Sequence, residues 1–470
     1  MAPRTTTART PSPQPRSTRR APTREQALAE QRLRLVMAMI DAIGEHGYRT
    51  TTVSDVIARA GASRKTFYKH FANKQECFLT THDLVSAQAM RRVEQAYREA
   101  EGWPDRVEAA IRALFQSAIG NPSAVRLATV EIGAVGAAGI ERRERLIARF
   151  ERFIADAAEL APGEGRISET AGRAVVGGLY RILDRGVSSG EHSELLELVP
   201  DLVTWVASYY PAPPAIAKSR RGRARTRAPL EGGRAPGTLS PHSPLRERRG
   251  LARGNQNVSR SFVIHSQRER ILDAVANLTA SKGYAALGVN DIAEEAAVSL
   301  GAFYEHFADK QDAFLVAYEL GHSKGLALAE RAYAAQPDWR TAVRAGIAAL
   351  FQFLASEPAF AHIALVDALT ATSRTAERSS AGVRAFARML VPGLQEAPGY
   401  SRPPVVTIEA IAAGVFELCL QYSMQSRIHE LPELTSDATY IVLAPFIGGE
   451  EAARIATASA TSRASSPRGP

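Results

Sequence analysis

Hydrophobic residues recur at helical spacing along most of this chain. In residues 30–45 the apolar side chains at positions 35, 36, 39, 40 and 43 fall on one face of a helix. The same spacing continues in residues 73–97, 105–119, 123–135, 140–160, 169–187 and 194–209. No segment shows sustained alternation of apolar and polar residues, so the pattern predicts an all-α fold.

Residues 52–71 predict two short helices joined by a tight turn. Thr52 and Asp55 have the spacing of a capping box, and Gly61 favours the left-handed backbone that ends a helix. Ser63 is placed to cap a second helix, whose outer surface carries cationic and hydrogen-bonding side chains. This arrangement is typical of a helix-turn-helix, which places its second helix in the major groove of DNA.

The chain contains this stretch twice, 236 residues apart. Residues 303–307 repeat the pattern of residues 67–71, and twelve of the 39 positions in residues 33–71 are identical to their mates. The register continues without a gap to Leu198 and its mate Leu434. A repeat of this length indicates duplication of a whole domain rather than a solenoid.

Composition divides the 470 residues into folded and disordered parts. Stretches rich in Arg, Pro, Gly or Ser without apolar periodicity predict disorder, here a basic tail, a basic linker and a final tail. These segments are residues 1–28, 211–262 and 451–470. The folded parts are then helix-turn-helix domains at 29–89 and 265–325, and helical regulatory bodies at 90–210 and 326–450.

The net charge of +9 lies in the basic segments. Residues 218–253 contain eleven Lys or Arg and two Glu, and the first 24 residues contain six Arg and no acidic residue. Such segments attract phosphate without regard to sequence, although a compositional bias is an equally simple explanation.

Two cysteines and short apolar runs limit where the protein works. With only Cys77 and Cys419, the chain needs no disulfide framework, which favours a reducing compartment. The longest apolar runs are too short to span a bilayer, and the N-terminus has no apolar signal core. We therefore expect a cytoplasmic protein with no membrane partner.

The segment between residues 47 and 76 resembles the TetR family of bacterial transcriptional regulators. It reads Gly-Tyr, Thr-x-x-Asp-Val-Ile, Ala-Gly-Ala-Ser, Thr-Phe-Tyr-Lys-His-Phe and Asn-Lys-Gln-Glu in order. The resemblance implies a three-helix DNA-binding head on a larger helical body, which dimerises through its last two helices and holds an inducer pocket. Most members are repressors that ligand releases from DNA. The family pattern has one copy per chain, whereas this chain has two.

The resemblance also implies which side chains contact DNA in the first copy. Arg64 or Lys65, early on the second helix of the motif, suits guanine O6 and N7, whereas Tyr68 and Lys69 suit the phosphate backbone. A solvated charged surface is the alternative reading, and His70 has no second ligand at metal spacing. The predicted DNA-binding residues are Thr52, Ser63, Arg64, Lys65, Thr66, Tyr68, Lys69, His70 and Lys74.

The second copy has the opposite charge. Residues 31–76 contain eight Lys or Arg and four Asp or Glu, whereas residues 267–312 contain four and eight. Lys69 is replaced by Glu305, and Gly61 by Ala297, which fits a left-handed turn less well. We predict strong DNA binding by the first copy, and weak binding, dimerisation or sensing by the second. The residues retained for weaker contact are Ser299, Tyr304, His306 and Lys310.

Aromatic residues of the two bodies are candidates for an effector pocket. They line a cavity or belong to the ordinary core, and they give a slight preference for an apolar or aromatic ligand. These residues are Trp103, Phe115, Tyr180, Trp339, Phe351 and Phe416.

The sequence thus predicts a regulator of transcription, a ligand-released repressor, with double-stranded DNA and an unknown small-molecule effector as partners. The two bodies pair within one chain as a pseudo-dimer, or two chains form a homodimer with four heads. The alternative function is nonspecific DNA binding or partner binding through the basic tails. We expect no enzyme activity and no cofactor, because we identify no His-Glu-x-x-His, no nucleophile elbow and no phosphate loop.

Overall fold

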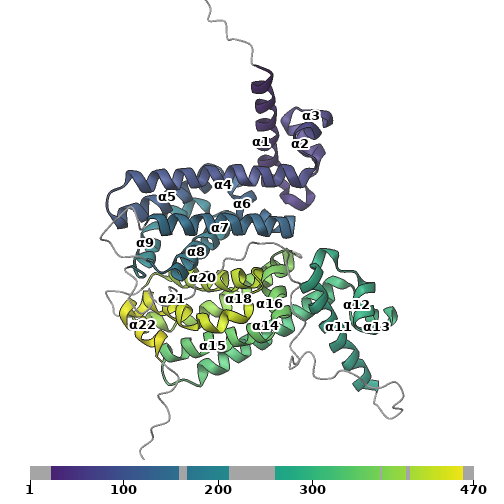
Figure 1. Ribbon diagram of the computed structural model, residues 1–470, viewed down its shortest axis with the longest axis vertical. Helices are drawn as coiled ribbons and strands as arrows, with labels where there is room; N and C mark the ends of the chain where they lie inside the picture. Colours follow the sequence, from purple (N-terminus) through teal and green to yellow (C-terminus); the bar gives the residue numbers. More distant parts are fainter. Residues whose placement is uncertain (1–22, 158–166, 211–259, 371–372, 398–402, 459–470) are drawn as a thin grey trace, which may run out of the picture.

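The structure is a computed structural model that describes residues 23–157, 167–210, 260–370, 373–397 and 403–458 (Figure 1). Within these ranges it consists of helices and turns and contains no strand. The helices form two units of the same design, the first unit (residues 23–210) and the second unit (residues 260–458). The predicted all-α fold is confirmed.

The first unit has a small head and a larger body. The first head contains α1 (Arg24–Thr50), α2 (Val53–Ala60) and α3 (Arg64–His70). The first body contains α4 (Lys74–Glu99), α5 (Trp103–Gly120), α6 (Pro122–Thr129), η1 (Glu131–Val135), α7 (Ala137–Ala157), α8 (Glu169–Ser189), η2 (His192–Leu198) and α9 (Val199–Ala207). Helix α4 runs from the head along the body (Figure 1).

The second unit repeats this order. The second head contains α11 (Arg260–Lys282), η3 (Tyr284–Ala286), α12 (Val289–Glu295) and α13 (Leu300–His306). The second body begins with α14 (Lys310–Ala334), α15 (Trp339–Ser356), α16 (Pro358–His362), η4 (Ile363–Asp367) and α17 (Ala368–Thr370). It ends with α18 (Ser373–Leu390), α19 (Gly393–Glu396), α20 (Val405–Met424), η5 (Ile428–Leu434), α21 (Thr435–Ile447) and α22 (Gly449–Thr457).

Three predicted disordered segments overlap helices at their edges. Helix α1 begins at Arg24, inside the predicted tail 1–28, because Thr23 and Gln26 form a capping box with bonds of 2.8 and 3.2 Å. Helix α11 begins at Arg260, inside the predicted linker 211–262. Helix α22 occupies the start of the predicted tail 451–470, because its alanines are buried against the second body. The remainder of these segments lies outside the described residues.

A buried apolar cluster holds each head together. In the first head, Phe67 and Phe71 of the α3 segment pack with Val56 of α2 against the apolar face of α1, which includes Leu35 and Met39. Their mates in the second head, Phe303 and Phe307, are buried in the same way. The hydrophobic spacing read from the sequence therefore fixes which surface of α3 and α13 faces outward.

The turn between the two helices of each motif has left-handed backbone geometry. Gly61 has φ of 58°, and a Cβ placed on it would meet no atom within 4 Å. Ala297 occupies the same place in the second head with φ of 51°. An L-residue is strained in this region because its Cβ approaches the following carbonyl oxygen. The second head therefore keeps the turn without the residue that favours it.

The two bodies meet at a close backbone contact between α8 and α20 (Figure 1). A Cβ on Gly178 would lie 2.7 Å from the carbonyl oxygen of Ala410, and a Cβ on Gly414 would lie 2.7 Å from that of Ala174. Because Ala174 and Gly178 are the repeat mates of Ala410 and Gly414, the two contacts exchange under a pseudo-twofold rotation. The units thus pair inside one chain as the halves of a symmetric dimer do.

Helix α9 of the first body and helix α21 of the second body complete this contact. Tyr209, which follows α9, donates a hydrogen bond of 2.8 Å from its hydroxyl to the carbonyl oxygen of Ile441 on α21. Trp205 donates to the same hydroxyl at 2.9 Å, so the Tyr209 oxygen is both donor and acceptor. Both side chains are buried, and their hydrogen bonds remove the cost of burying polar atoms.

Helix α20 combines a length of 20 residues with an apolar composition. Among the described helices it is the one that is long and apolar enough to cross a membrane by itself, and α15 with the following residues passes as a bent pair. Within the fold, 72% of the apolar window of α20 is buried. Packing between the two bodies accounts for its composition, as in the core helix of a large protein.

The strained turn predicts that glycine is more stabilising than alanine at this position in both heads. We expect Ala297→Gly to stabilise the second head by roughly 0.5–1 kcal/mol, because relief of the left-handed strain exceeds the added chain entropy of glycine. The matched change Gly61→Ala should destabilise the first head by about 1 kcal/mol. Amide hydrogen exchange of α11 and α1 measures each head separately. A loss of protection in the Ala297→Gly head would contradict the strain assigned to this turn.

The close contact predicts that one added methyl group destabilises the packing of the two bodies. We expect Gly414→Ala to cost about 1–3 kcal/mol of unfolding free energy, because its Cβ would approach Ala174 backbone atoms that cannot move aside. The control is Gly120→Ala at the end of α5, where an added Cβ meets no atom within 4 Å. Urea unfolding of both variants compares them. Equal midpoints would show that α8 and α20 are not in such close contact.

Candidate nucleic-acid interface

Helix α3 is fixed on the first head by its cap and by its inner side chains. The hydroxyl of Ser63 accepts a hydrogen bond of 3.1 Å from the Thr66 amide and lies 3.0 Å from the Thr66 hydroxyl. Phe67, on the opposite surface, is buried. The cap and the buried ring together leave one surface of α3 facing away from the head.

That outward surface carries cations. Arg64, Lys65, Tyr68 and Lys69 are exposed, and the Tyr68 ring is 53% exposed. The Arg64 guanidinium donates a hydrogen bond of 3.0 Å to the Ser54 hydroxyl on α2, which holds its stem between the two helices. We name these four residues the α3 surface. Thr52, at the exposed start of α2, is engaged with Asp55 in the predicted capping box.

Lys74 lies apart from the α3 surface. Its ammonium donates hydrogen bonds of 2.8 Å to the carbonyl oxygens of Tyr48 and Thr51, and it sits 4.2 Å from the centre of the Tyr48 ring. Burial lowers the pKa of this lysine. The side chain therefore ties the start of α4 to the junction of α1 and α2, and DNA contact by Lys74 stays a prediction.

His70 and Thr66 are half-buried. The His70 ring lies 3.5 Å from the Gln31 side chain of α1, and burial, with the charges of Lys69 and Arg32, lowers its pKa. A neutral imidazole offers one N–H donor and no cation to phosphate. The structure thus brings together the four residues of the α3 surface and places His70 at its edge, facing α1.

The second head presents the same scaffold with a different surface. Ser299 accepts a hydrogen bond of 3.0 Å from the Ala302 amide, and Lys310 donates one of 2.8 Å to the Leu287 carbonyl oxygen. Tyr304 is 57% exposed, whereas burial lowers the pKa of the half-buried His306. The remaining outward positions of α13 are Leu300, Gly301 and Glu305. No cation projects from the outward positions of α13.

A carboxylate joins each head to its body. Glu131 of η1 accepts a hydrogen bond of 2.8 Å from the Tyr48 amide and forms an ion pair of 3.2 Å with Arg126. In the second unit, its mate Asp367 accepts one of 3.3 Å from the Tyr284 amide. Burial raises the pKa of Asp367 to about 7. The sequence analysis missed this anchor, whose only signal was an acidic residue at the same place in both copies.

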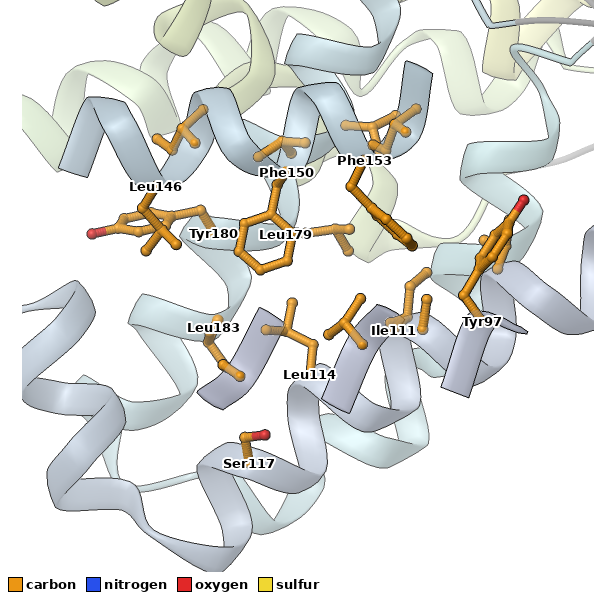
Figure 2. A pocket seen from close by; sticks show the side chains of 18 of the residues that line it. Tyr97, Ile111, Leu114, Ser117, Leu146, Phe150, Phe153, Leu179, Tyr180 and Leu183 are labelled. Atoms are coloured by element: carbon orange, nitrogen blue, oxygen red, sulfur yellow. The ribbon is translucent and has the colours of Figure 1, made fainter. Parts of the chain in front are cut away.

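The first body contains an apolar cavity of about 150 Å³ (Figure 2). Side chains from α4, α5, α7 and α8 point into it, with Phe150 and Phe153 of α7 facing Ile111 and Leu114 of α5 (Figure 2). Val125, Ala128 and Thr129 of α6 complete the wall. The α7 residues were not singled out from the sequence, because an amphipathic helix reads the same whether its apolar face meets a core or a cavity.

The six predicted pocket residues divide into two groups. Trp103 and Tyr180 line the first cavity, and Phe416 lines a second apolar cavity of about 130 Å³ in the second body. Phe115, Trp339 and Phe351 lie in the buried core and border neither cavity. Effector binding by all six residues stays a prediction.

No catalytic or metal constellation is found in the described part of the chain. Within it, no group of three or more His, Cys, Asp or Glu side chains is arranged to hold a metal ion. Residues 186–190 spell Gly-x-Ser-x-Gly, but they end helix α8 instead of following a strand. The strand-to-helix turn that a nucleophile elbow requires is therefore missing there.

Solved structures with similar folds are bacterial regulators of low sequence identity. FadR from Bacillus halodurans is 14% identical, with 37% of this chain and 94% of that chain covered and a TM-score of 0.34. FadR from Bacillus subtilis in complex with stearoyl-CoA is 15% identical, with 37% and 96% covered and a TM-score of 0.34. A TetR-like regulator from a Rhodococcus species is 17% identical, with 39% and 96% covered and a TM-score of 0.32. A comparison with curated protein sequences gives no match.

The sequence profile of the bacterial regulatory proteins of the tetR family matches the chain twice. The matches cover residues 38–81 and 271–317, which span α2 and α3 of the first head and α12 and α13 of the second. Each match also includes the end of the first head helix and the start of the long body helix. The chain therefore contains two TetR-like units in tandem, each with a head of the helix-turn-helix type.

Proposed function

We propose that this protein is a repressor that reads one DNA half-site through the α3 surface of the first head. The observation that carries the proposal is the contrast between two heads of one scaffold, of which only the first presents Arg64, Lys65 and Lys69 outward. An apolar small molecule in the cavity of the first body releases it from DNA.

The α3 surface has the chemistry of both base reading and phosphate binding. Arg64 and Lys65, at the start of α3, offer paired N–H donors to guanine O6 and N7 in the major groove. Tyr68 and Lys69 lie one turn further along and suit phosphate oxygens, which fix the orientation of the head. Thr52 and Ser63 are exposed residues at the starts of α2 and α3, where their hydroxyls accept the amides of Asp55 and Thr66.

The second head contributes little to affinity in this proposal. Glu305 stands where Lys69 stands in the first head, and a carboxylate there repels phosphate. Leu300 and Gly301 offer no side-chain donor in place of Arg64 and Lys65. Ser299, Tyr304, His306 and Lys310 are left for weak contact, and Lys310 is already bonded to the backbone of the head.

The cavity of the first body suits an apolar effector. Its wall is built almost entirely of aliphatic and aromatic side chains, with the few polar groups supplied by residues such as Ser117 and Tyr180. Tyr180 donates its hydroxyl to the Thr129 carbonyl oxygen at 2.9 Å, so this group is not open to a ligand in the empty cavity. Hydrophobic burial then provides most of the binding free energy of the effector.

The cavity is linked to the head through α6. Val125, Ala128 and Thr129 line the cavity, and two residues later Glu131 binds the Tyr48 amide at the base of the first head. A ligand that pushes α6 outward would move Glu131 and tilt the head. Release follows if the ligand binds more tightly to the tilted body than to the DNA-bound body.

The alternative function is sequence-independent binding to DNA or to a partner through the basic tails. Of the segments that would carry it, residues 1–22 and 218–253 lie outside the described residues. Under this alternative, affinity is lost when residues 1–28 and 218–253 are removed, and it does not depend on the α3 surface. Under either function we place the protein in the cytoplasm and assign it no catalytic activity.

The α3 surface predicts graded losses of DNA binding. With the DNA upstream of the coding region as probe, we expect Arg64→Ala or Lys65→Ala to weaken binding by about 10–100-fold and to relax sequence preference. Lys69→Ala should weaken binding to all sequences and reduce the salt slope by about 1. Fluorescence anisotropy at several salt concentrations measures both quantities.

The matched control uses the second head. Glu305→Ala, at the position equivalent to Lys69, should leave binding unchanged or strengthen it, because it removes a negative charge facing the groove. Arg98→Ala, an exposed arginine of α4, controls for general loss of positive charge. Equal losses from Arg98→Ala and Arg64→Ala would favour the sequence-independent alternative.

The link between cavity and head predicts that filling the cavity mimics the effector. We expect Ala110→Phe, which extends a ring from α5 into the cavity, to weaken binding to the same DNA at least about tenfold, a typical allosteric coupling. Combining it with Glu131→Ala should remove most of this effect. Thermal unfolding confirms that each variant is folded. A stable Ala110→Phe protein with unchanged DNA affinity would refute the coupling.

A further inference from the structure

A buried cluster of charges crosses the contact between the two bodies. Glu417 of α20 accepts two hydrogen bonds from the guanidinium of Arg143 on α7, of 3.1 and 2.7 Å, and one of 3.0 Å from Arg173 on α8. All three side chains are almost entirely buried. Glu417 is therefore the second body's only contribution to these bonds, and both cations come from the first body.

The first body supplies further carboxylates around the two arginines. Arg173 donates to Glu144 at 2.8 Å and pairs with Glu151 at 3.1 Å. The Arg143 guanidinium also lies 4.4 Å from the centre of the Tyr180 ring. Burial alone would raise the pKa of Glu417, but the charges of Arg143 and Arg173 outweigh it, so its pKa lies below the ordinary value. Glu417 is thus an anion in the folded protein.

A second ion pair crosses the contact with the same polarity. Arg185 of α8 is bonded to Glu409 of α20, at a more exposed position than the cluster. Both crossing pairs therefore take their cation from the first body and their carboxylate from the second. A symmetric dimer of identical chains has no such polarity, because each side must supply both members of every pair.

The repeat register shows what each unit carries at the corresponding place. Glu417 is the mate of Arg181, and Glu409 is the mate of Arg173. Arg143 is the mate of Ser379, and Arg185 is the mate of Gln421. At two of these four positions the two units thus have opposite charges, and at the other two an arginine of the first unit corresponds to a neutral residue of the second.

We propose that these buried charges make the pairing of the two bodies obligately mixed, so that a first unit pairs with a second unit and not with another first unit. The partner surface is the α8 face of the first body, and the occupant it selects is the α20 face of this chain's own second body. The proposal concerns how the units assemble and does not depend on the assignment of DNA or effector.

Pairing of two first units would bury like charges. Arg181 would take the place of Glu417 and face Arg143 and Arg173, and Arg173 would take the place of Glu409 and face Arg185. Glu144 and Glu151 would still pair with Arg173, but the buried cluster would hold a positive charge at the place where it now holds a negative one. Such an excess of buried positive charge is strongly unfavourable because water no longer solvates it. The first unit is therefore poorly suited to form a dimer with itself.

Pairing of two second units fails for the opposite reason. Glu417 would face Glu409 and Ser379 instead of two arginines, and no cation would replace them at these positions. The close contact of the glycines and alanines, by contrast, is the same in all three pairings, because Ala174 and Gly178 match Ala410 and Gly414. Shape permits every pairing, and charge selects one.

A buried ion pair suits this selective role better than a stabilising one. The cost of removing charges from water often cancels their attraction, so such a pair adds little to stability compared with apolar side chains. Removing one partner, however, leaves the other charge buried alone. The free-energy cost of burying a charge without its partner therefore disfavours the incorrect pairings relative to the correct one.

The test uses the full chain with a protease site placed in the linker at residue 235. The folded protein is purified, cut, and analysed by sedimentation and native mass spectrometry. The proposal expects the two fragments to remain together as a one-to-one complex at micromolar concentration. Separation into homodimers of the first unit and homodimers of the second would overturn it.

Charge variants identify the cause of the pairing. In the cut protein we expect Glu417→Gln, which keeps the side-chain shape, to raise the dissociation constant of the fragments at least about 100-fold. The control Glu430→Gln removes a carboxylate that pairs with Arg427 inside the second body and should leave the constant unchanged. Equal effects of the two variants, or no effect of either, would overturn the role of the cluster.

The exposed pair allows a charge swap. Arg185→Glu and Glu409→Arg should each weaken the complex about 2–5-fold, and the double variant should recover most of the loss. Circular dichroism checks that every variant remains helical. A double variant weaker than both single variants would show that the crossing polarity does not govern the pairing. The mass of the uncut protein is also measured at several concentrations. If it rises with concentration while the cut product stays one-to-one, unlike units pair between two chains, and mixed pairing is still supported.

Discussion

The close approach of α8 and α20 is the constraint on which the rest of the structure depends. Two glycines, Gly178 and Gly414, lie against the backbone of the opposite helix, and this geometry tolerates no side chain at either place. It fixes the two bodies about a pseudo-twofold axis, and each body carries its head through the long helix α4 or α14. The placement of both DNA-binding motifs therefore follows from a contact that is far from either of them in sequence and in space (Figure 1).

The two units keep what the scaffold requires and differ where they face solvent or each other. Lys74 and Lys310 bind the same pair of backbone carbonyl positions, and Glu131 and Asp367 bind the same backbone amide. A side chain that satisfies backbone groups cannot be replaced without leaving those groups unpaired, whereas a charge on the surface can. The outward surfaces of α3 and α13 have therefore diverged in charge on two heads that share one scaffold, which supports the different roles proposed for them.

Much of this fold follows from sequence patterns, and the misses share one cause. The helices follow from residues close together in the chain, and the duplication follows from a repeat at one fixed offset, so the sequence predicted both. The bonds of Lys74 to carbonyl oxygens 23 and 26 residues away were missed because no local pattern reveals them, and DNA contact by Lys74 stays a prediction. The pairing of Glu417 with Arg143 joins residues 274 positions apart and becomes visible only when the units are folded together. Helix bounds were displaced where a cap, as at Thr23, or a buried face, as in α22, extended a helix into a polar segment.

Mixed pairing changes what duplication achieves for a DNA-binding protein. A symmetric dimer presents two identical heads, so each favourable contact is made twice on a palindromic site. Here one molecule presents one cationic and one acidic motif, so under the proposed function the second half-site adds little attraction and the first head supplies nearly all the specific contacts. In exchange, the pairing is intramolecular, and its effective concentration does not fall when the protein is scarce. The two bodies are also free to differ, and their cavities do differ at matched positions, where Ser86 and Tyr180 of the first cavity correspond to His322 and Phe416 of the second. Tandem fusion with opposite charges at the contact thus turns a symmetric architecture into one whose two heads and two cavities can differ within the same chain.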